Sequence, residues 1–405
     1  MKDIAPSDPR GAANECPALH GRALPTDGTQ LRLSPTLAAW RDEAAATPLQ
    51  YADGHVGWIV TRNELAKEIL LDPRFTRETT RLPMPGDPHA DIDADAQESI
   101  RVGGPLDNDG DVHARLRRAI APRFSLKAAR SYRAKIAEIV QAQIGSIAKH
   151  VGPVDLTSAY AAPISAQVHC LVMGVPDRLS AAYSPIFVGE STLQRKFDFA
   201  REALALKQQE PGDDVLSDLV RSDLSPHEQE GLALVVLSAG RDSVAHLIST
   251  SVVALLLHRE QWDWLGANPD RMPAAVEEFV RVGSLFVTLF SRTAKEDLTI
   301  GSLEVQTGQS VSVAVAAANR DERQFDNPEQ FDVTRDAFGH LGFGHGIHAC
   351  VGQQVARTVI AEAVWALMER WPGLRLVDAE QLRPLPFAHP VATHATGQVL
   401  VEWEQ

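Results

Sequence analysis

The sequence predicts a mainly α-helical fold with a small β portion. The first observation behind this prediction is a helical spacing of apolar residues that dominates from about residue 112 to residue 270. Glycine and proline break this stretch at residues 152–153, 174–176 and 211–212, as expected of turns between helices. The second observation is the segment 351–371, whose apolar positions 355, 359, 360, 363, 364 and 367 return at the same spacing.

The β portion is expected in three segments. Residues 51–61 (YADGHVGWIVT) combine β-branched and aromatic side chains with two turn glycines, and Asn63 is then expected to cap a helix that ends at Leu71. Residues 298–315 predict a hairpin with Thr307-Gly308 at its turn. Residues 382–404 predict short strands.

The chain is expected to form one large domain. It has 405 residues, of which 44% are hydrophobic, so there is ample material for a sizeable core. Glycine and proline are scattered rather than clustered, and no repeat is visible. We therefore expect a flexible N-terminal segment at residues 1–30 and a single domain at residues 31–405.

Charge and cysteine content exclude several classes of protein. The net charge of −14 disfavours nucleic acid and anionic membranes as partners. The first 28 residues contain no apolar run, and residues 232–257 are interrupted by Arg241, Asp242 and His246, which predicts a buried helix rather than a membrane span. The three cysteines at positions 16, 170 and 350 argue against a disulfide framework. We expect a cytoplasmic monomer.

The most informative residues are 343–352, which read FGHGIHACVG. Cys350 follows a loop that contains Gly344 and Gly346 and stands just ahead of the predicted helix at 351–371. A thiolate at this place gains from the positive end of the helix and from unpaired backbone N–H groups. The glycines allow the loop to fold tightly and a flat macrocycle to approach it, and Phe343 is placed to shield the sulfur from water.

Other interpretations of this cysteine remain open at this point. A buried free cysteine in a glycine-rich turn is the ordinary interpretation of an isolated cysteine. Zinc is an alternative because His340, His345 and His348 lie near Cys350, although their spacing matches no common zinc pattern and a second cysteine is missing. A c-type haem requires a C-x-x-C-H motif, which the sequence does not contain.

The loop resembles the cysteine loop of the cytochrome P450 family, F-x-x-G-x-x-x-C-x-G, through Phe343, Gly346, Cys350 and Gly352. The resemblance covers the chain from about residue 35 to its end and is to the soluble bacterial class that receives electrons from a ferredoxin. It implies the single-domain cytochrome P450 fold and a haem b whose iron is bound by the thiolate of Cys350. Such a ligand pushes electron density onto the iron and favours O–O cleavage.

The resemblance also assigns haem contacts outside this loop. His113 and Arg117 lie one helical turn apart, which alone would indicate a solvated helix face. By resemblance they bind a haem propionate, and Arg292 and His348 act in the same way. Besides these four, the expected haem contacts are Ala239, Phe343, Gly344 and Gly352.

Two further sets of charged residues acquire a role from the resemblance. Glu278 and Arg281 alone would be an ordinary solvated pair three residues apart. In the family position they resemble the buried pair that joins Arg335 behind the haem and has a structural role. The neighbouring Arg115 and Arg118 are expected to contribute to a basic proximal patch that attracts an acidic ferredoxin.

Residues 239–243 read AGRDS, where most family members have A-G-x-D/E-T. Gly240 is expected to permit a helix distortion that makes room for dioxygen. Asp242 and Ser243 occupy the acid and alcohol positions that relay protons, and Ser243 keeps the hydroxyl but lacks the methyl group of threonine. His246 is expected to be a core histidine, with a substrate contact as the alternative. Whether Arg241 contacts the substrate stays open.

We expect a haem-thiolate monooxygenase of bacterial secondary metabolism that hydroxylates or otherwise oxidises a fairly large organic substrate. Electrons are expected to come from NAD(P)H through a ferredoxin reductase and a ferredoxin. One alternative is oxidative aryl cross-linking of a peptide. The segment between Pro176 and Pro211, which in most members of the family builds the two helices above the pocket, is shorter here, and the resemblance therefore implies an open distal face. A non-catalytic haem-binding recruitment protein is the remote alternative, which the retention of Asp242 and Ser243 disfavours.

Overall fold

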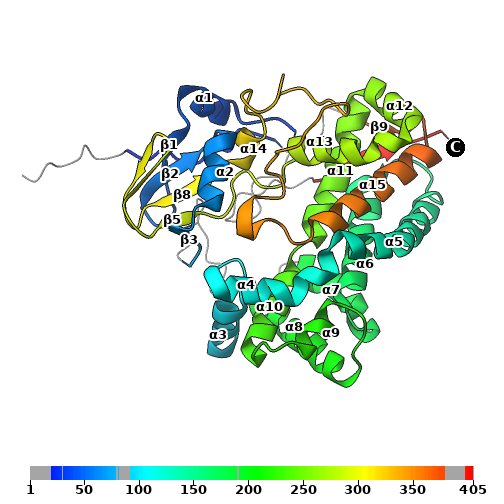
Figure 1. Cartoon of the computed structure of the whole chain (residues 1–405). Helices are drawn as coiled ribbons and strands as arrows, with labels where there is room; N and C mark the ends of the chain where they lie inside the picture. Colours follow the sequence, from blue (N-terminus) through cyan, green and yellow to red (C-terminus); the bar gives the residue numbers. More distant parts are fainter. Residues whose placement is uncertain are drawn as a thin grey trace, which may run out of the picture.

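The computed structural model describes residues 20–29, 31–78, 81, 92–188, 191–378 and 397–404. Helices make up the larger part of this chain, and the larger sheet lies at one side together with α1, α2 and α14 (Figure 1). The helices are α1 (Pro35–Glu43), α2 (Asn63–Leu71), α3 (Ala94–Gly103), α4 (Gly110–Ile120), α5 (Leu126–Ile147), α6 (Ala162–Met173), α7 (Asp177–Val188), α8 (Leu193–Gln209), α9 (Val215–Arg221), α10 (Pro226–Ser238), α11 (Arg241–Leu257), α12 (Arg259–Ala267), α13 (Met272–Val282), α14 (Val315–Ala318) and α15 (Gln353–Arg370). The predicted mainly α-helical fold is confirmed.

In the described part of the chain, the strands form three sheets. The five-stranded sheet has the order β1-β2-β8-β5-β3, and its only parallel pair is β2 with β8. Its strands are β1 (Ala46–Gln50), β2 (Val56–Val60), β3 (Phe75–Thr76), β5 (Arg292–Ala294) and β8 (Ser310–Val313). A three-stranded sheet joins β4 (Val154–Asp155), β10 (Leu400–Glu402) and β9 (Arg375–Leu376), and a hairpin joins β6 (Leu298–Ile300) to β7 (Leu303–Val305).

The start of α2 differs from the expectation. Asn63 is the first helical residue rather than the cap, because Arg62 holds the cap position. The backbone N–H of Asn63 donates to the carboxylate of Asp321 over 3.0 Å. An acceptor from a distant segment therefore satisfies this helix end, which a reading of local sequence cannot detect.

The hairpin at residues 298–315 is also placed differently. β6 and β7 pair across a turn at Gly301-Ser302, with Ile300 opposite Leu303. Thr307-Gly308 instead connects β7 to β8, which belongs to the five-stranded sheet. Of the strands expected at residues 382–404, β10 is present, and residues 382–396 lie outside the described part of the chain.

Part of the expected flexible N-terminal segment is packed onto the domain. Arg22 forms a β-bridge with Leu49 of β1, and the side chain of Leu24 is buried. Arg22 and Leu24 thus contact the domain, while residues 1–19 and 30 lie outside the described part of the chain.

The core of the helical part is built around α11. Its side chains Ile248, Val252 and Leu255 are fully buried, and α11 packs against α6, α13 and α15. Together α10 and α11 are apolar and long enough to cross a membrane by composition alone, but 61% of their most apolar window is buried inside the fold. This burial agrees with the expected core helix.

Candidate active site

The backbone of the cysteine loop fixes Cys350 immediately before α15. The N–H of Cys350 donates to the carbonyl oxygen of Phe343 over 2.8 Å. Gly344 and Gly346 adopt φ values of +71° and +73°, which favour glycine. A Cβ atom on Gly346 would also lie 2.6 Å from the carbonyl oxygen of Leu70, so the loop approaches α2 too closely for any other residue.

The Cys350 thiol opens on an interior cavity. The surrounding protein atoms desolvate the sulfur, which raises the pKa of the thiol, while the backbone N–H of Gly352 and the guanidinium groups of Arg117 and Arg357 lower it. A metal cation would shift this balance strongly toward the thiolate. The ring of Phe343, which was expected to shield the sulfur, packs under the guanidinium of Arg357, whose central carbon lies 4.5 Å from the ring centroid.

The cavity has a volume of about 460 Å³, within the usual range for ligand pockets, and most of its wall is apolar. Its wall is formed mainly by α4, α6, the α10–α11 junction, residues 284–292, the cysteine loop and α15. The polar or charged side chains on the wall are those of Arg77, His113, Arg117, Ser165, His169, Ser238, Asp242, Ser243, Ser284, Arg292, His345, His348 and Cys350.

One end of the cavity is rich in cationic and imidazole groups. The rings of His113 and His348 lie 4.3 Å apart, and His348 Nε2 donates to the carboxylate of Asp109 over 2.8 Å. The Nδ1 atom of His348 and the Nε atom of Arg292 are buried and have no hydrogen-bond partner among the residues that the structure describes. Two buried polar atoms of this kind are unfavourable unless a ligand satisfies them. A carboxylate suits the Arg292 N–H directly, and it suits His348 Nδ1 once that ring is protonated.

Burial also sets the protonation of this group. Burial, together with the nearby His348 and Arg117, lowers the pKa of His113 to about 4. Burial likewise lowers the pKa of His348, while its hydrogen bond to Asp109 acts in the opposite direction. An arriving carboxylate would favour the charged form of both rings, because an opposite charge raises the pKa of a base.

The residues of the predicted structural network meet on α13. Arg281 donates to Glu278 through Nε and Nη2 over 2.7 and 2.8 Å, and both side chains are completely buried. Arg335 Nε lies 3.4 Å from the same carboxylate. Arg281 also donates to the carbonyl oxygens of Asn319, Pro328 and Gln330. The structure thus brings together all three residues and rules out the solvated pair that Glu278 and Arg281 alone would indicate.

The long helix is interrupted where the sequence reads AGRDS. α10 ends at Ser238 and α11 begins at Arg241, with Ala239 in an extended conformation and Gly240 at φ +93°. The expected distortion at Gly240 is therefore a complete break. Ala239, Gly240, Asp242 and Ser243 all line the cavity that Cys350 faces. The carboxylate of Asp242 accepts a hydrogen bond from Nη1 of Arg241, and its side chain is 69% exposed.

Three other basic residues lie away from this arrangement. Arg115 does not belong to a free basic patch, because its guanidinium binds the carboxylate of Glu228 on α10. Arg241 is buried and pairs with Asp242 instead of lining the cavity. His246 is buried with its Nε2 3.2 Å from the carbonyl oxygen of Gly283, which supports the interpretation as a core histidine.

The zinc alternative finds no support in the geometry of the described residues. His340 contacts Glu277 through Nε2 and the N–H of Gly342 through Nδ1, while His348 contacts Asp109. A different group, Asp95, His227 and Glu230, has a spacing compatible with a metal ion. There the guanidinium of Arg201 already binds both carboxylates, so a cation would have to displace it.

The contribution of α6 to the cavity wall is not evident from the sequence. Ser165 and His169 are polar wall residues from α6. Conversely, no residue of α7 or α8 that the structure describes lines the cavity, although these helices occupy the segment expected to form its roof. Helical spacing predicts that one face of α6 is buried, but it does not predict that this face lines a cavity instead of packing against another helix.

The family model for cytochrome P450 matches residues 271–371. The chain is 32% identical over 385 residues to nocardicin C N-oxygenase of Nocardia uniformis subsp. tsuyamanensis, covering 88% of this chain and 92% of that protein. It is 34% identical over 358 residues to vitamin D(3) 25-hydroxylase of Pseudonocardia autotrophica, covering 84% and 87%. The chain belongs to the cytochrome P450 family. The crystal structure of cytochrome P450 MoxA from Nonomuraea recticatena matches it with a TM-score of 0.83 at 29% identity, covering 95% of this chain and 99% of that chain.

This cytochrome P450 is therefore a haem-thiolate monooxygenase of bacterial secondary metabolism, and the relatives favour oxygen transfer over peptide cross-linking. The residues present suit a haem. The cavity offers a cysteine sulfur on its wall, and the unpartnered Arg292 Nε and His348 Nδ1 suit the carboxylates of the propionates.

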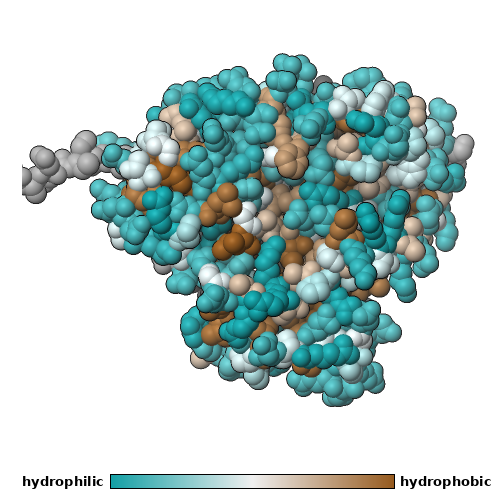
Figure 2. Space-filling model, viewed as in Figure 1, coloured by the Kyte–Doolittle hydropathy of each residue, from teal (hydrophilic) through white to brown (hydrophobic). Residues whose placement is uncertain are grey.

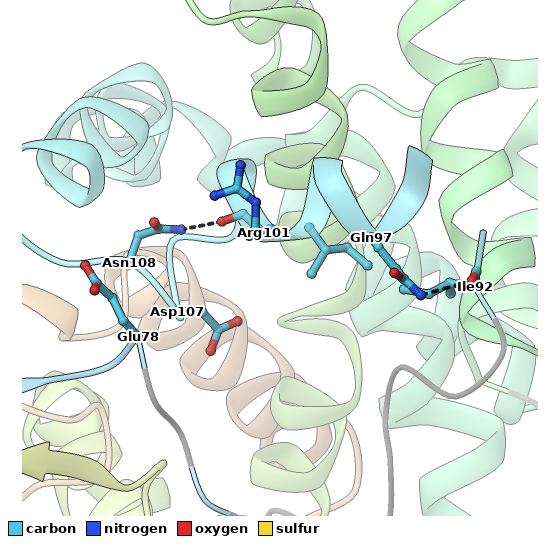
Figure 3. A pocket seen from close by; sticks show the side chains of 7 residues that line it. Glu78, Ile92, Gln97, Arg101, Asp107 and Asn108 are labelled. Carbon is cyan, nitrogen blue, oxygen red and sulfur yellow. Dashed lines mark hydrogen bonds between the residues drawn. The ribbon is translucent and has the colours of Figure 1, made fainter. Parts of the chain in front are cut away.

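A second cavity lies between α3 and the segment that precedes α4 (Figure 3). It is lined by Glu78, Ile92, Gln97, Ile100, Arg101, Asp107 and Asn108. Asn108 donates to the carbonyl oxygen of Arg101 over 3.1 Å, and Gln97 donates to that of Ile92 over 3.4 Å. These bonds stay within the wall, so we assign the cavity no chemistry.

Proposed function

We propose that this cytochrome P450 oxidises a fairly large organic molecule in the cavity beside Cys350, and that Cys350 is the proximal iron ligand. One observation carries the proposal. Cys350, the cationic end formed by Arg292 and His348, and the pair Asp242 and Ser243 all line a single cavity. This is the set of groups needed to hold a haem by its iron and its propionates while an acid and an alcohol face the same space.

A haem bound through a thiolate supplies oxygen activation, because the ligand pushes electron density onto iron and favours O–O cleavage. The protein residues around it have separable tasks. His113, Arg117, Arg292 and His348 would hold the propionates of the haem. Arg117 and Arg357 also stabilise negative charge on the sulfur, since both lower the pKa of the Cys350 thiol.

Asp242 and Ser243 hold and move protons in this proposal. The Ser243 hydroxyl carries a hydrogen atom that it can donate into the cavity and recover from the carboxyl group of Asp242. The 69% exposure of the Asp242 side chain gives it access to water for resupply. Arg241 restrains the carboxylate through a hydrogen bond from its Nη1 atom.

Electrons are proposed to enter from a ferredoxin, supplied by NAD(P)H through a reductase, on the side of the cysteine loop. Figure 2 shows apolar side chains gathered between α2 and the loop that precedes α15. The exposed apolar residues of these segments are Leu71, Phe338 and Ile347. With the exposed Arg118 of α4, they suit a small acidic carrier that docks through an apolar centre. A monomer in the reducing cytoplasm fits this arrangement.

The test is product formation under labelled dioxygen. Candidate substrates are first selected by the low-to-high-spin change that follows displacement of water from the iron. A reconstituted mixture of the protein, ferredoxin, reductase and NADPH is then supplied with ¹⁸O₂, and we expect a product that carries one ¹⁸O atom. A cross-linked product without ¹⁸O would show that the reaction is oxidative coupling and not monooxygenation. Full activity in Cys350→Ala would show that the site is assigned wrongly.

A further inference from the structure

The cavity extends to α6 at the break in the long helix. Five residues of α6 line it, and three of them are apolar: Val168, Val172 and Met173. The hydroxyl of Ser165 donates to the carbonyl oxygen of Arg241 over 2.5 Å, so its single hydrogen atom is already used. Among the α6 residues of the cavity wall, His169 is therefore the one best able to form a further hydrogen bond.

The ring of His169 presents its Nε2 edge to the break. A Cβ atom on Gly240 would lie 3.3 Å from both Cδ2 and Nε2 of His169. Because residue 240 is glycine, no side chain stands between this edge and the break. The Nδ1 atom, on the other edge, lies 2.5 Å from the hydroxyl oxygen of Tyr183 on α7.

The partners of Tyr183 determine which nitrogen carries the proton. The Tyr183 hydroxyl also lies 2.9 Å from the carbonyl oxygen of Leu237, which can only accept. Its one hydrogen atom therefore goes to Leu237, and the Tyr183 oxygen accepts from Nδ1–H of His169. The neutral ring then has its lone pair at Nε2, on the edge that faces the break.

The ring stays neutral at ordinary pH. Burial and the charge of Arg241 together bring the pKa of His169 to about 4, although a hydrogen bond to the Val236 carbonyl group raises it. An acceptor in a largely apolar wall is costly when desolvated without a partner. A ligand that brings a donor to this place gains affinity, and an otherwise equal ligand without one is disfavoured.

We propose that His169 Nε2 is the hydrogen-bond acceptor of a subsite on the α6 side of the cavity, which selects substrates that carry a hydroxyl or N–H group. The proposal rests on the proposed function, because it assumes that the substrate occupies this cavity. His169 acts here as a specificity-determining residue, and Tyr183 acts through it as a positioning residue.

The first experiment measures the tautomer. The haem-loaded protein is labelled with ¹⁵N-histidine and studied in its diamagnetic ferrous carbonyl form, with His169→Asn used to assign the signal. We expect a ring protonated at Nδ1 and unprotonated at Nε2. The opposite pattern, in which Nε2–H turns to the Val236 carbonyl group, would overturn the proposal.

The second experiment measures binding of 4-phenylimidazole and its 2-, 3- and 4-hydroxyphenyl derivatives, whose azole nitrogen binds haem iron and shifts the Soret band. At least one derivative is expected to gain about 2- to 10-fold in affinity over the parent, as one hydrogen bond would give. His169→Asn keeps a group near Tyr183 but withdraws the cavity acceptor, so the gain should vanish. His169→Gln extends an amide oxygen toward the Nε2 position and should retain part of it.

Met173→Leu, on the same helix and wall, is the matched control and should change all four affinities together. Equal ratios of affinity in wild type and His169→Asn would show that His169 only supports the broken helix end, and the subsite would be wrong. An absent azole spectrum in wild type would instead overturn the haem site and the proposed function with it. The two failures are thus distinguishable.

Discussion

At the scale of single residues, the chemistry of this protein depends on Cys350, whose neighbours shift the pKa of its thiol in opposite directions. Burial raises the pKa of the Cys350 thiol, and two guanidinium groups and backbone N–H groups lower it. The sulfur is therefore suited to bind a metal cation rather than to act as a free nucleophile, because only a strong positive charge completes its deprotonation. The other described cysteine, Cys170, is partly buried and does not line the cavity that contains the Cys350 sulfur.

Replacement of Cys350 by alanine should remove the thiolate ligand. The reduced carbon monoxide complex should then lose its red-shifted Soret band, because that shift requires a thiolate opposite the carbon monoxide. The measurement is the reduced difference spectrum, with Cys170→Ala as the control that keeps the band. A band retained in Cys350→Ala would show that another residue binds the iron.

Asp242→Asn should slow turnover far more than it weakens substrate binding, because it removes the acid but preserves the shape. A positioned proton-transfer group contributes about 10²–10⁴-fold in rate. Ser243→Ala should instead release more peroxide per NADPH consumed, while Ser243→Thr should be tolerated. Product formed against NADPH consumed is the measurement, and wild-type coupling in both Asp242→Asn and Ser243→Ala would exclude the relay.

At the scale of elements, burial decides what a pair of charges contributes. Glu278 and Arg281 on α13 and Glu98 and Arg101 on α3 share the same spacing along a helix. The first pair is completely buried, whereas Glu98 and Arg101 are 45% and 69% exposed. Removal of one partner leaves an uncompensated charge only in the buried pair.

Arg281→Ala should therefore destabilise the protein by about 3–5 kcal/mol and reduce its haem content. Arg101→Ala removes one partner of an exposed pair with the same spacing, and it should leave the free energy of unfolding nearly unchanged. Urea unfolding curves and haem absorbance per protein provide both measurements. Similar urea unfolding curves for the two variants would contradict the claim that burial makes the Glu278–Arg281 pair important for stability.

The break between α10 and α11 is the other element-scale feature. Side chains of neighbouring helices satisfy its backbone, since Tyr183 donates to the Leu237 carbonyl oxygen and Ser165 to that of Arg241. Gly240 at φ +93° makes the change of direction possible at little cost. The break thus exposes Asp242 and α6 to one cavity.

At the scale of the whole molecule, the net charge of −14 disfavours an acidic partner, so docking must rely on a local surface. The exposed apolar residues Leu71, Phe338 and Ile347 provide such a surface beside the cysteine loop. Leu71 lies next to this loop, because a Cβ atom on Gly346 would be 3.4 Å from its Cδ2 atom.

Leu71→Asp should weaken ferredoxin docking, because it places a negative charge in the apolar centre that faces an acidic partner. We expect the KM for ferredoxin to rise by about 10-fold, the effect of losing roughly 1.4 kcal/mol, with an unchanged carbon monoxide spectrum. Val151→Asp alters an apolar residue that is 88% exposed and lies between α5 and β4, and should have no effect. Equal KM values in the two variants would place the docking surface elsewhere.

Much of the site follows from local sequence because its chemistry is local. The spacing of Phe343, Gly346 and Cys350 fixes a loop, and the helical spacing after it fixes α15. The i, i+4 spacing of His113 and Arg117 places both on one face of α4, and both line the cavity. Such features depend only on backbone geometry and on the helix period, so they can be predicted from the local sequence.

What the sequence by itself determined was the mainly helical fold, the loop of Cys350 and the acid and alcohol at positions 242 and 243. The tertiary structure decided which groups meet across long separations. It pairs Arg115 with Glu228, caps α2 with Asp321 and opens the wall at α6. The physical reason is that helix periodicity specifies which face of an element is buried, whereas the partner of that face depends on packing between segments distant in the chain.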